Sequence, residues 1–233
     1  MIKDNNISCF IPCRAGSVRV PRKNITPIGP FKFGLLQIKL DQVLSCTKID
    51  DVIISTNDDE ILSYVYKLQK TNSNLIIDER ADELCSSNTS TDELIEYVPS
   101  LVESGNILWT HVTSPFLTTS SYDLLITKYL SLGVGFDSLM TVSKIQNFLW
   151  NKSHPTNYNR DIEKWPRTQT LDPVYEVTSG AFIASLDKYS ATHDRIGFRP
   201  YLYVSDKFES LDVDWPEDFE FVSNLIASGV RNV

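Results

Sequence analysis

The stretch that decides the fold is ISCFIP, from Ile7 to Pro12, which leads through Cys13 into RAGSVRVPRK, from Arg14 to Lys23. The first segment is apolar and has the length of a buried strand, whereas the second is basic and contains Gly16. Glycine lets the backbone approach an anion closely, and free N–H groups there can point at its oxygens. We therefore expect a phosphate-binding loop after a buried strand. The simpler alternative is a solvated basic loop between a strand and a helix.

The composition suits one large α/β domain and excludes several classes of protein. A chain of 233 residues, 42% of them apolar, can bury a full core. Its formal net charge of −8 disfavours a nucleic-acid-binding protein, because phosphate backbones select for basic surfaces. Against this acidic background, the cations of the loop can neutralise a bound phosphate: Arg14, Arg19, Arg22 and Lys23.

Cysteine usage and hydropathy indicate the compartment. Four cysteines without metal-ligand spacing suit free thiols in a reducing cytosol, although an even number leaves disulfides open. The sequence has no apolar region behind a basic start and no run of about 18 apolar residues. We therefore expect a cytoplasmic protein that makes no contact with a membrane.

Short β-branched runs alternate with amphipathic stretches, which predicts a mainly parallel sheet with helices on both faces. Ligands of such sheets bind beyond the carboxyl ends of the strands. This rule places Arg14, residues 55–58 and residues 110–114 on one rim. The expected strands are 7–11, 52–55, 75–77, 107–112, 138–142, 181–184 and 201–204, and the expected helices are 34–44, 59–69, 91–98, 122–132 and 216–226.

Residues 144–178 interrupt this alternation. The segment is rich in Asn, Pro, Trp and Tyr and lacks helical periodicity. A loop of this length is seldom structureless inside a compact domain. We expect an excursion that either covers the site or packs against another subunit.

A second motif, SLDVDWPED, runs from Ser210 to Asp218. In an extended segment, the carboxylates of Asp212 and Asp214 point to the same side. Like charges this close need a neutralising cation, and hard oxygen ligands beside substrate phosphates suit Mg²⁺. The alternative is a solvated strand end, in which Asp214 caps the helix that begins at Pro216.

These segments resemble motifs of the CMP-acylneuraminate (sialic acid) cytidylyltransferases. Residues 13–24 are similar to the family pattern ARxGSxRxPxKN, and residues 210–218 to S-[IL]-D-[IV]-D-x-x-x-D. Similar motifs extend from Ile7 to Phe221 in the family's order. The resemblance implies one three-layer α/β/α, Rossmann-like nucleotidyltransferase domain over residues 1–233 with a mainly parallel sheet. It also implies a homodimer, with residues 144–178 as the dimerisation excursion.

The activity implied by the resemblance is CTP + acid sugar → CMP-sugar + pyrophosphate, where the acid is a 2-keto-3-deoxy sugar such as a nonulosonic acid. Asp212 and Asp214 would then hold Mg²⁺, and Arg14, Lys23 and Asp214 would be the catalytic residues. VIISTND (52–58) and RADEL (80–84) resemble nucleotide-binding segments of the family. The implied nucleotide site comprises Arg14, Ala15, Gly16, Ser17, Arg22, Lys23, Asn24, Ser55, Asn57, Arg80 and Thr91.

The segments that the resemblance assigns to sugar binding depart from the family pattern. In THVTSPFL (110–117), His111 replaces the Gln of QPTSPLR and Leu117 replaces its Arg, while Ser179 replaces an Asn. The implied substrate-binding residues are His111, Thr113, Ser114, Arg167, Gln169, Tyr175 and Ser179. The departures keep two alternatives open: a same-fold enzyme that activates a Kdo-like sugar or a phosphonate, and a nucleotide-binding protein without catalysis.

Several of these residues also have structural interpretations. Residues 52–58 can be an ordinary strand that ends in a polar turn. His111 can be a core histidine at a strand end, and Arg80 a surface side chain in a charged loop. Thr91 can cap the helix that follows it. Arg167 can belong to a dimer interface.

Overall fold

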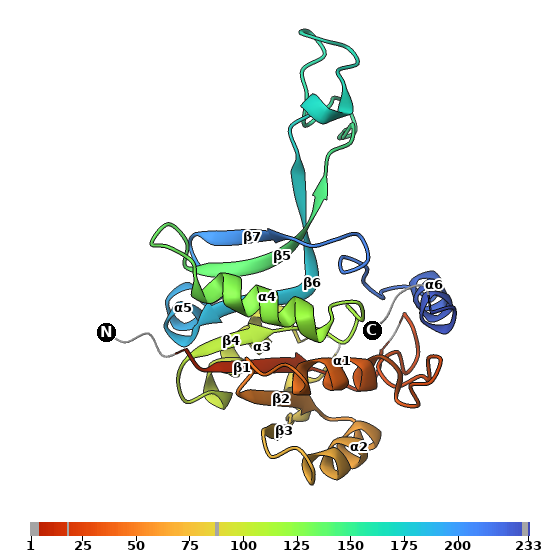
Figure 1. Ribbon diagram of the computed structural model, residues 1–233, viewed down its shortest axis with the longest axis vertical. Helices are drawn as coiled ribbons and strands as arrows, with labels where there is room; N and C mark the ends of the chain where they lie inside the picture. The colour runs from red at the N-terminus through yellow and green to blue at the C-terminus, as the bar shows by residue number, and fades with distance from the viewer. Residues whose placement is uncertain (1–4, 18, 87–88, 230–232) are drawn as a thin grey trace.

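The computed structural model describes residues 5–17, 19–86, 89–229 and 233, so Val18 of the loop motif lies outside the described residues. Its centre is one seven-stranded sheet with the order β3-β2-β1-β4-β6-β5-β7 (Figure 1). All neighbouring strands are parallel except β6, which is antiparallel to both β4 and β5. The strands are β1 (Ile7–Pro12), β2 (Asp51–Thr56), β3 (Leu75–Glu79), β4 (Asn106–Trp109), β5 (Ser138–Ile145), β6 (Val174–Ser185) and β7 (Pro200–Val204).

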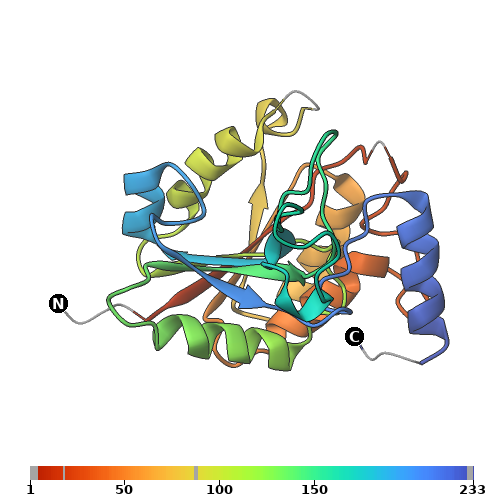
Figure 2. The ribbon, with the colours of Figure 1, turned by 90° about the horizontal axis from the view of Figure 1, so that it is seen from above.

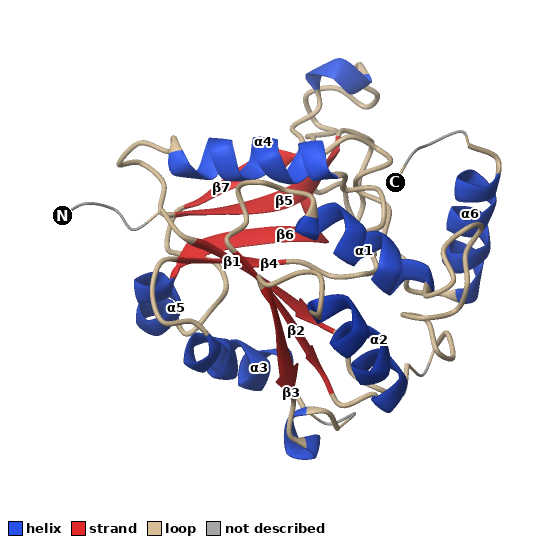
Figure 3. Ribbon diagram, turned by 60° about the horizontal axis from the view of Figure 1, so that its bottom comes forward, coloured by secondary structure: helices blue, strands red, loops and turns tan. Residues whose placement is uncertain are grey.

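Helices cover both faces of the sheet, which makes three layers (Figure 3). One core cluster joins the sheet to α1, α2 and α4, and the other joins its opposite face to α3 and α5. The mainly parallel α/β fold expected from the sequence is confirmed. The helices are α1 (Gly34–Leu44), α2 (Asp59–Gln69), α3 (Thr91–Tyr97), α4 (Thr119–Leu130), α5 (Leu186–Thr192) and α6 (Pro216–Ala227).

Side-chain caps explain where α2 and α4 begin. The expected bounds of α1 and α2 are confirmed, and Asp58 caps α2 by accepting from the N–H groups of Glu60 and Ile61. In contrast, α4 begins three residues before the expected position, because Thr118 and Ser121 form a capping box. The short helix α5 was not expected.

Two strands differ from the sequence-based expectation. β4 ends at Trp109, not at Val112, because residues 112–113 turn and Pro115 follows. β6 is twelve residues long, whereas only residues 181–184 were expected to form a strand. Its first half is mostly exposed, over residues 174–177, and lacks the apolar run that marks a buried strand.

The excursion is a two-stranded arm that projects from the sheet (Figures 1 and 2). The ends of β5 and β6 form its base, with Ile145 paired to Val174 and Val142 to Val177. Residues 146–173 form its tip. Phe148 packs edge-on against Tyr158 and Trp165, so the tip has a small aromatic cluster of its own.

The last helix, α6, lies beside the loop that follows β1, at the carboxyl edge of the parallel strands (Figure 1). Val222 and Ile226 bury its apolar face in the larger core cluster. In the described ranges, no helix combines the length and apolarity that crossing a membrane would require.

Candidate active site

Two hydrogen bonds tie the loop after β1 to the end of β2 and to the turn that follows it. The Cys13 N–H donates to the Ser55 carbonyl at 2.8 Å, and the Ala15 N–H donates to Asn57 Oδ1 at 3.0 Å. Gly16 has a φ of +76°, a conformation that side chains with a Cβ disfavour. The loop lines a hollow of about 240 Å³, whose lining residues include Arg14, Gly16, Ser17, Pro21, Arg22, Asn24, Ile25 and Asp58.

The cations of this loop point in different directions. Arg14 donates to the carbonyls of Cys85 and Ser86, which ties the loop to the segment after β3. Arg22 pairs with Glu60 of α2 at 2.5 Å. Lys23 donates to the Val213 carbonyl at 2.7 Å and lies 3.6 Å from an Asp214 oxygen.

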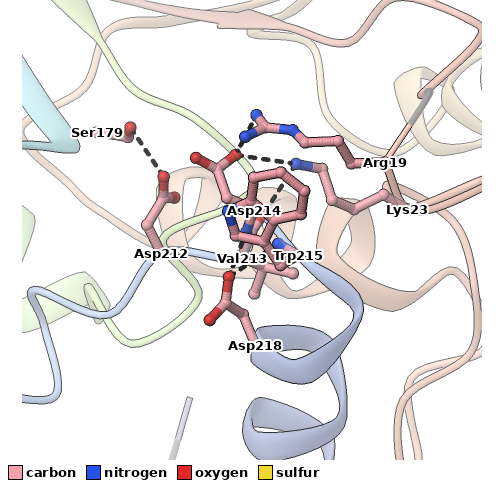
Figure 4. A network of polar contacts seen from close by, with 8 residues as sticks. All are labelled: Arg19, Lys23, Ser179, Asp212, Val213, Asp214, Trp215 and Asp218. Atoms are coloured by element: carbon pink, nitrogen blue, oxygen red, sulfur yellow. Dashed lines mark hydrogen bonds and ion pairs between the residues drawn. The ribbon is translucent and has the colours of Figure 1, made fainter.

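The basic loop and the late acidic motif meet at Asp214 (Figure 4). Arg19 donates to Asp214 Oδ1 at 2.7 Å, and its guanidinium lies 5.1 Å from the Trp215 ring centroid. Lys23 contributes the second cation, and only 12% of its side chain is exposed. Two cations therefore offset the negative charge of the Asp214 carboxylate. Carboxylates as close in sequence as Asp212 and Asp214 were expected to need such a neutralising charge.

Asp212 lies beside Asp214, with both carboxylates projecting to the same side of the segment (Figure 4). Its Oδ2 accepts from Ser179 at 3.1 Å, which joins it to β6. Its Oδ1 is buried and meets no hydrogen-bond partner among the residues that the structure describes. An orphaned carboxylate oxygen beside a second carboxylate fits a divalent cation. Within the described part of the chain no group of three or more His, Cys, Asp or Glu forms a metal site, so phosphate oxygens would have to complete the coordination.

Asp214 does not cap α6, contrary to the alternative drawn from the sequence. The cap position is Trp215, and Asp218 accepts from the N–H groups of Asp214 and Trp215 at 3.0 and 2.8 Å. Asp218 therefore stabilises the start of α6 and leaves the Asp214 side chain directed at the loop.

Ser55 and Arg80 form a buried network behind the loop. Arg80 is only 4% exposed, so the surface position considered for it is wrong. It donates through Nε to Ser55 Oγ at 2.9 Å and through NH2 to the Ser55 carbonyl at 2.6 Å. Ser55 donates in turn to Asp78, which also accepts from Tyr97. These contacts direct both side chains into the protein, where they position β2 and β3.

The helix cap considered at Thr91 lies one residue earlier. Ser90 accepts from the Glu93 N–H, and the Glu93 carboxylate accepts from the Ser90 N–H, which makes a capping box. Thr91 is the first residue of α3 and is exposed. Its hydroxyl is therefore not used in capping.

The segment after β4 lies against the late motif. The Thr113 carbonyl accepts from the Val213 N–H at 2.9 Å. The Ser114 carbonyl accepts from Lys39 at 2.9 Å, and Lys39 also donates to the Tyr122 hydroxyl. Lys39 is fully buried, and this burial lowers its pKa from 10.5 to about 7.

His111 as a residue is partly exposed, whereas its ring is desolvated. Its Nε2 lies 2.8 Å from the Trp109 indole nitrogen and 3.3 Å from an Arg195 nitrogen. Desolvation of the ring, with Arg195, Lys23 and Lys39 as nearby cations, lowers the pKa of His111 to about 3. The ring is therefore neutral at neutral pH.

Three predicted substrate residues lie on the arm. Arg167 precedes the short 3₁₀ turn Thr168–Thr170, and Tyr175 is in the exposed half of β6. The Gln169 carbonyl accepts from Gln146 within the arm. In the single chain these residues project with the arm, away from the basic loop (Figure 1).

Several contributors were not singled out in the sequence analysis. Arg19 was counted among the loop cations, but its partners Asp214 and Trp215 were not anticipated. The sequence signal for Lys39 is its position as a lysine within the apolar stretch that forms α1. No local sequence pattern indicates a role for Arg195, because its partner His111 lies 84 residues away in the sequence.

A larger hollow, of about 470 Å³, lies between α1 and the start of α4. Asp41 is the one charged side chain among its described lining residues, and no Lys or Arg lines it. This chemistry does not suit a triphosphate. The smaller hollow at the basic loop remains the nucleotide candidate.

Among solved structures, the chain is similar to CMP:2-keto-3-deoxy-manno-octonic acid synthetase complexed with CTP, with a TM-score of 0.64, 18% identity, and 96% and 99% of the two chains covered. It is also similar to 4-diphosphocytidyl-2C-methyl-D-erythritol synthase from Anaerococcus prevotii, with a TM-score of 0.67, 15% identity, and 96% and 97% covered. At these identities, the likeness shows the fold.

The chain belongs to the cytidylyltransferase family, whose model matches residues 8–225. It is 26% identical to the pseudaminic acid cytidylyltransferase of Campylobacter jejuni subsp. jejuni serotype O:23/36, over 93% of this chain and 94% of that protein. It is also 26% identical to the N-acylneuraminate cytidylyltransferase of Streptococcus agalactiae serotype III, over 91% of this chain. The match spans 51% of the streptococcal protein.

Proposed function

We propose that this cytidylyltransferase transfers CMP from CTP to a nonulosonic acid, a 2-keto-3-deoxy sugar such as sialic or pseudaminic acid. The observation that carries the proposal is the meeting of Asp214 with Arg19 and Lys23, beside Asp212, at the carboxyl edge of the sheet. The names of the two bacterial relatives support the class of acid.

In the proposed reaction, the anomeric hydroxyl of the acid forms a bond to the α-phosphorus of CTP and releases its proton to water. The bond from that phosphorus to the oxygen bridging it to the β-phosphorus breaks, and pyrophosphate leaves. The loop from Arg14 to Lys23 holds the triphosphate, with Gly16 and Ser17 at the hollow. The protein's contribution is then mainly alignment and charge stabilisation.

Asp212 and Asp214 would hold Mg²⁺ together with oxygens of the α- and β-phosphates. The ion would supply Lewis-acid stabilisation of the charge that develops on those oxygens. Ser179 orients the Asp212 carboxylate through its hydrogen bond. Arg19 and Lys23 pair with Asp214 in the free protein and would contact the same phosphates when CTP binds.

We further propose that two copies of the chain form a dimer through the arm. Exposed apolar side chains mark this surface, in amounts that a monomer seldom carries in one place. They include Trp150, Ile162, Trp165, Val174 and Val177. In such a dimer, Arg167, Gln169 and Tyr175 of one arm would reach the partner's site. Sedimentation of the intact chain tests this, and a monomer at micromolar concentration would exclude it.

A Kdo-like sugar or a phosphonate is the second candidate. It is favoured by the absence of two expected polar side chains, because Leu117 is buried where the family pattern has Arg and Ser179 replaces Asn. The acceptor pocket therefore differs chemically from the family pattern.

The deciding experiment is pyrophosphate release with Mg²⁺, pairing CTP, UTP, GTP or ATP with N-acetylneuraminate, pseudaminate or Kdo. We expect release with CTP and a nine-carbon acid alone. Release with Kdo alone would favour the second candidate. CTP binding without release by any acid would contradict the proposed reaction while leaving the nucleotide site intact.

A further inference from the structure

The His111 ring receives two hydrogen-bond donors on one nitrogen. Trp109 Nε1 lies 2.8 Å from His111 Nε2, and Arg195 NH1 lies 3.3 Å from the same atom. An indole N–H and a guanidinium can donate but cannot accept. Both contacts therefore require that Nε2 carry no proton.

Arg195 is held in this position by stacking. Its guanidinium carbon lies 3.8 Å from the Phe182 ring centroid and 5.2 Å from that of Trp109. Trp109 and Phe182 are opposite each other on β4 and β6 and are buried. Asp194 accepts from the Arg195 backbone N–H, but no carboxylate of the described residues forms an ion pair with the Arg195 guanidinium. The charge of Arg195 therefore also acts on the neighbouring ring.

The remaining nitrogen of the neutral ring, Nδ1, must then carry the proton. Within the described ranges Nδ1 meets no acceptor, and the residue is not fully buried. His111 lies directly beyond β4, two residues before Thr113, whose carbonyl contacts the late motif. A ligand at the carboxyl edge of the sheet would find an N–H donor here.

We propose that Trp109 and Arg195 fix His111 as the neutral Nδ1–H tautomer, which donates a hydrogen bond to an acceptor oxygen of the acid sugar. This inference rests on the proposed function. It makes His111 a specificity-determining residue and Arg195 a positioning residue. A donor of fixed direction selects an acceptor at one place on the sugar, whereas a titrating imidazole would not.

The tautomer can be read directly from ¹⁵N chemical shifts of the histidine rings in the free protein. The chain has three histidines, and the variants His193→Asn and His154→Gln assign the other two. Asn suits position 193, where φ is +52°. We expect an unprotonated Nε2 and no titration of His111 between pH 5 and pH 8. A protonated Nε2, or titration near pH 6.5, would overturn the inference.

The role of Arg195 has its own readout. In Arg195→Met, loss of the neighbouring cation should raise the pKa of the His111 ring. The same variant should raise KM for the acid more than KM for CTP. An unchanged His111 titration and equal effects on both KM values would indicate a purely structural role for Arg195.

Kinetics test the donated hydrogen bond. His111→Gln retains an N–H donor, whereas His111→Leu does not. With the acid that wild type uses fastest, we expect His111→Leu to raise KM for that acid about tenfold and His111→Gln to raise it less. Equal KM values for wild type and His111→Leu would overturn the inference. A wild type that turns over none of the acids would instead overturn the proposed function, while the ¹⁵N shifts still decide the tautomer.

Discussion

The Arg19 guanidinium lies 2.7 Å from Asp214 Oδ1, although the two residues are 195 positions apart. The contact joins the loop after the first strand to the segment before the last helix (Figure 4). Both side chains are nearly half-exposed, at 47% and 43%. The pair therefore contributes little to stability, and Arg19 is free to exchange Asp214 for a phosphate.

Replacing Arg19 should weaken CTP binding without unfolding the protein. In Arg19→Met, we expect KM for CTP to rise about tenfold, because a charge-assisted hydrogen bond to phosphate is lost. The melting temperature should be unchanged. Steady-state kinetics and thermal unfolding check both parts, with Arg199→Met, at the amino edge of the sheet, as the matched control. A rise in KM for CTP in the control as large as in Arg19→Met would contradict the assignment.

Replacing the buried Arg80 should lower the stability of the protein, in contrast to replacing Arg19. Arg80→Met removes two hydrogen bonds from a charged donor, to Ser55 Oγ and to the Ser55 carbonyl, and each is worth about 1.5–3 kcal/mol. Ser55 keeps its contacts with Asp78 and with the Cys13 N–H. We expect a clear fall in the free energy of unfolding, measured by urea denaturation. A variant as stable as wild type, but with weakened CTP binding, would show that Arg80 contacts the nucleotide directly.

Asp218 should stabilise α6 through the two N–H groups that it accepts. Asp218→Ala should lower the free energy of unfolding by about 0.5–2 kcal/mol, the usual cost of a lost cap. Asp218→Asn keeps an acceptor oxygen and should recover most of this loss. If both variants unfold at the same urea concentration as wild type, the capping role is wrong.

Lys39 should make stability depend on pH. Its pKa is lowered to about 7 in the folded protein, so above pH 7 the unfolded chain binds a proton that the native protein has released. Stability attributable to this group therefore rises with pH between 7 and 10.5. Relative to Lys39→Met, wild type should gain up to about 1.4 kcal/mol per pH unit from pH 7 to pH 9. A difference that stays constant over this range would contradict the lowered pKa.

Much of the fold was predictable because local patterns reflect it. The bounds of α2 followed from its amphipathic periodicity and from the polar turn at Asp58, whereas those of α1 followed from an apolar stretch that is buried on most sides. The exposed half of β6 was missed because residues 174–177 have no buried run to mark a strand. The early start of α4 depends on the capping box of Thr118 and Ser121, which the apolar periodicity of the helix does not indicate.

The site was predictable as a set of segments but not as a set of contacts. Ligands of parallel sheets bind at the carboxyl edge, and this rule predicted that the basic loop and the segment after β4 lie on one rim. The direction of Arg14 toward Ser86 and of Arg195 toward His111 depends on contacts across 72 and 84 residues. No local pattern specifies such contacts, since they arise from the packing of distant elements.

The central claim, that Asp212 and Asp214 complete one metal and triphosphate site with the basic loop, is tested by one comparison. Pyrophosphate release from CTP and the preferred acid is measured against Mg²⁺ concentration for wild type, Asp212→Asn and Asp214→Asn. We predict Mg²⁺-dependent release by wild type and a loss on the order of 10²–10³-fold in each folded variant. Near wild-type rates in either variant, at any Mg²⁺ concentration, would contradict the account.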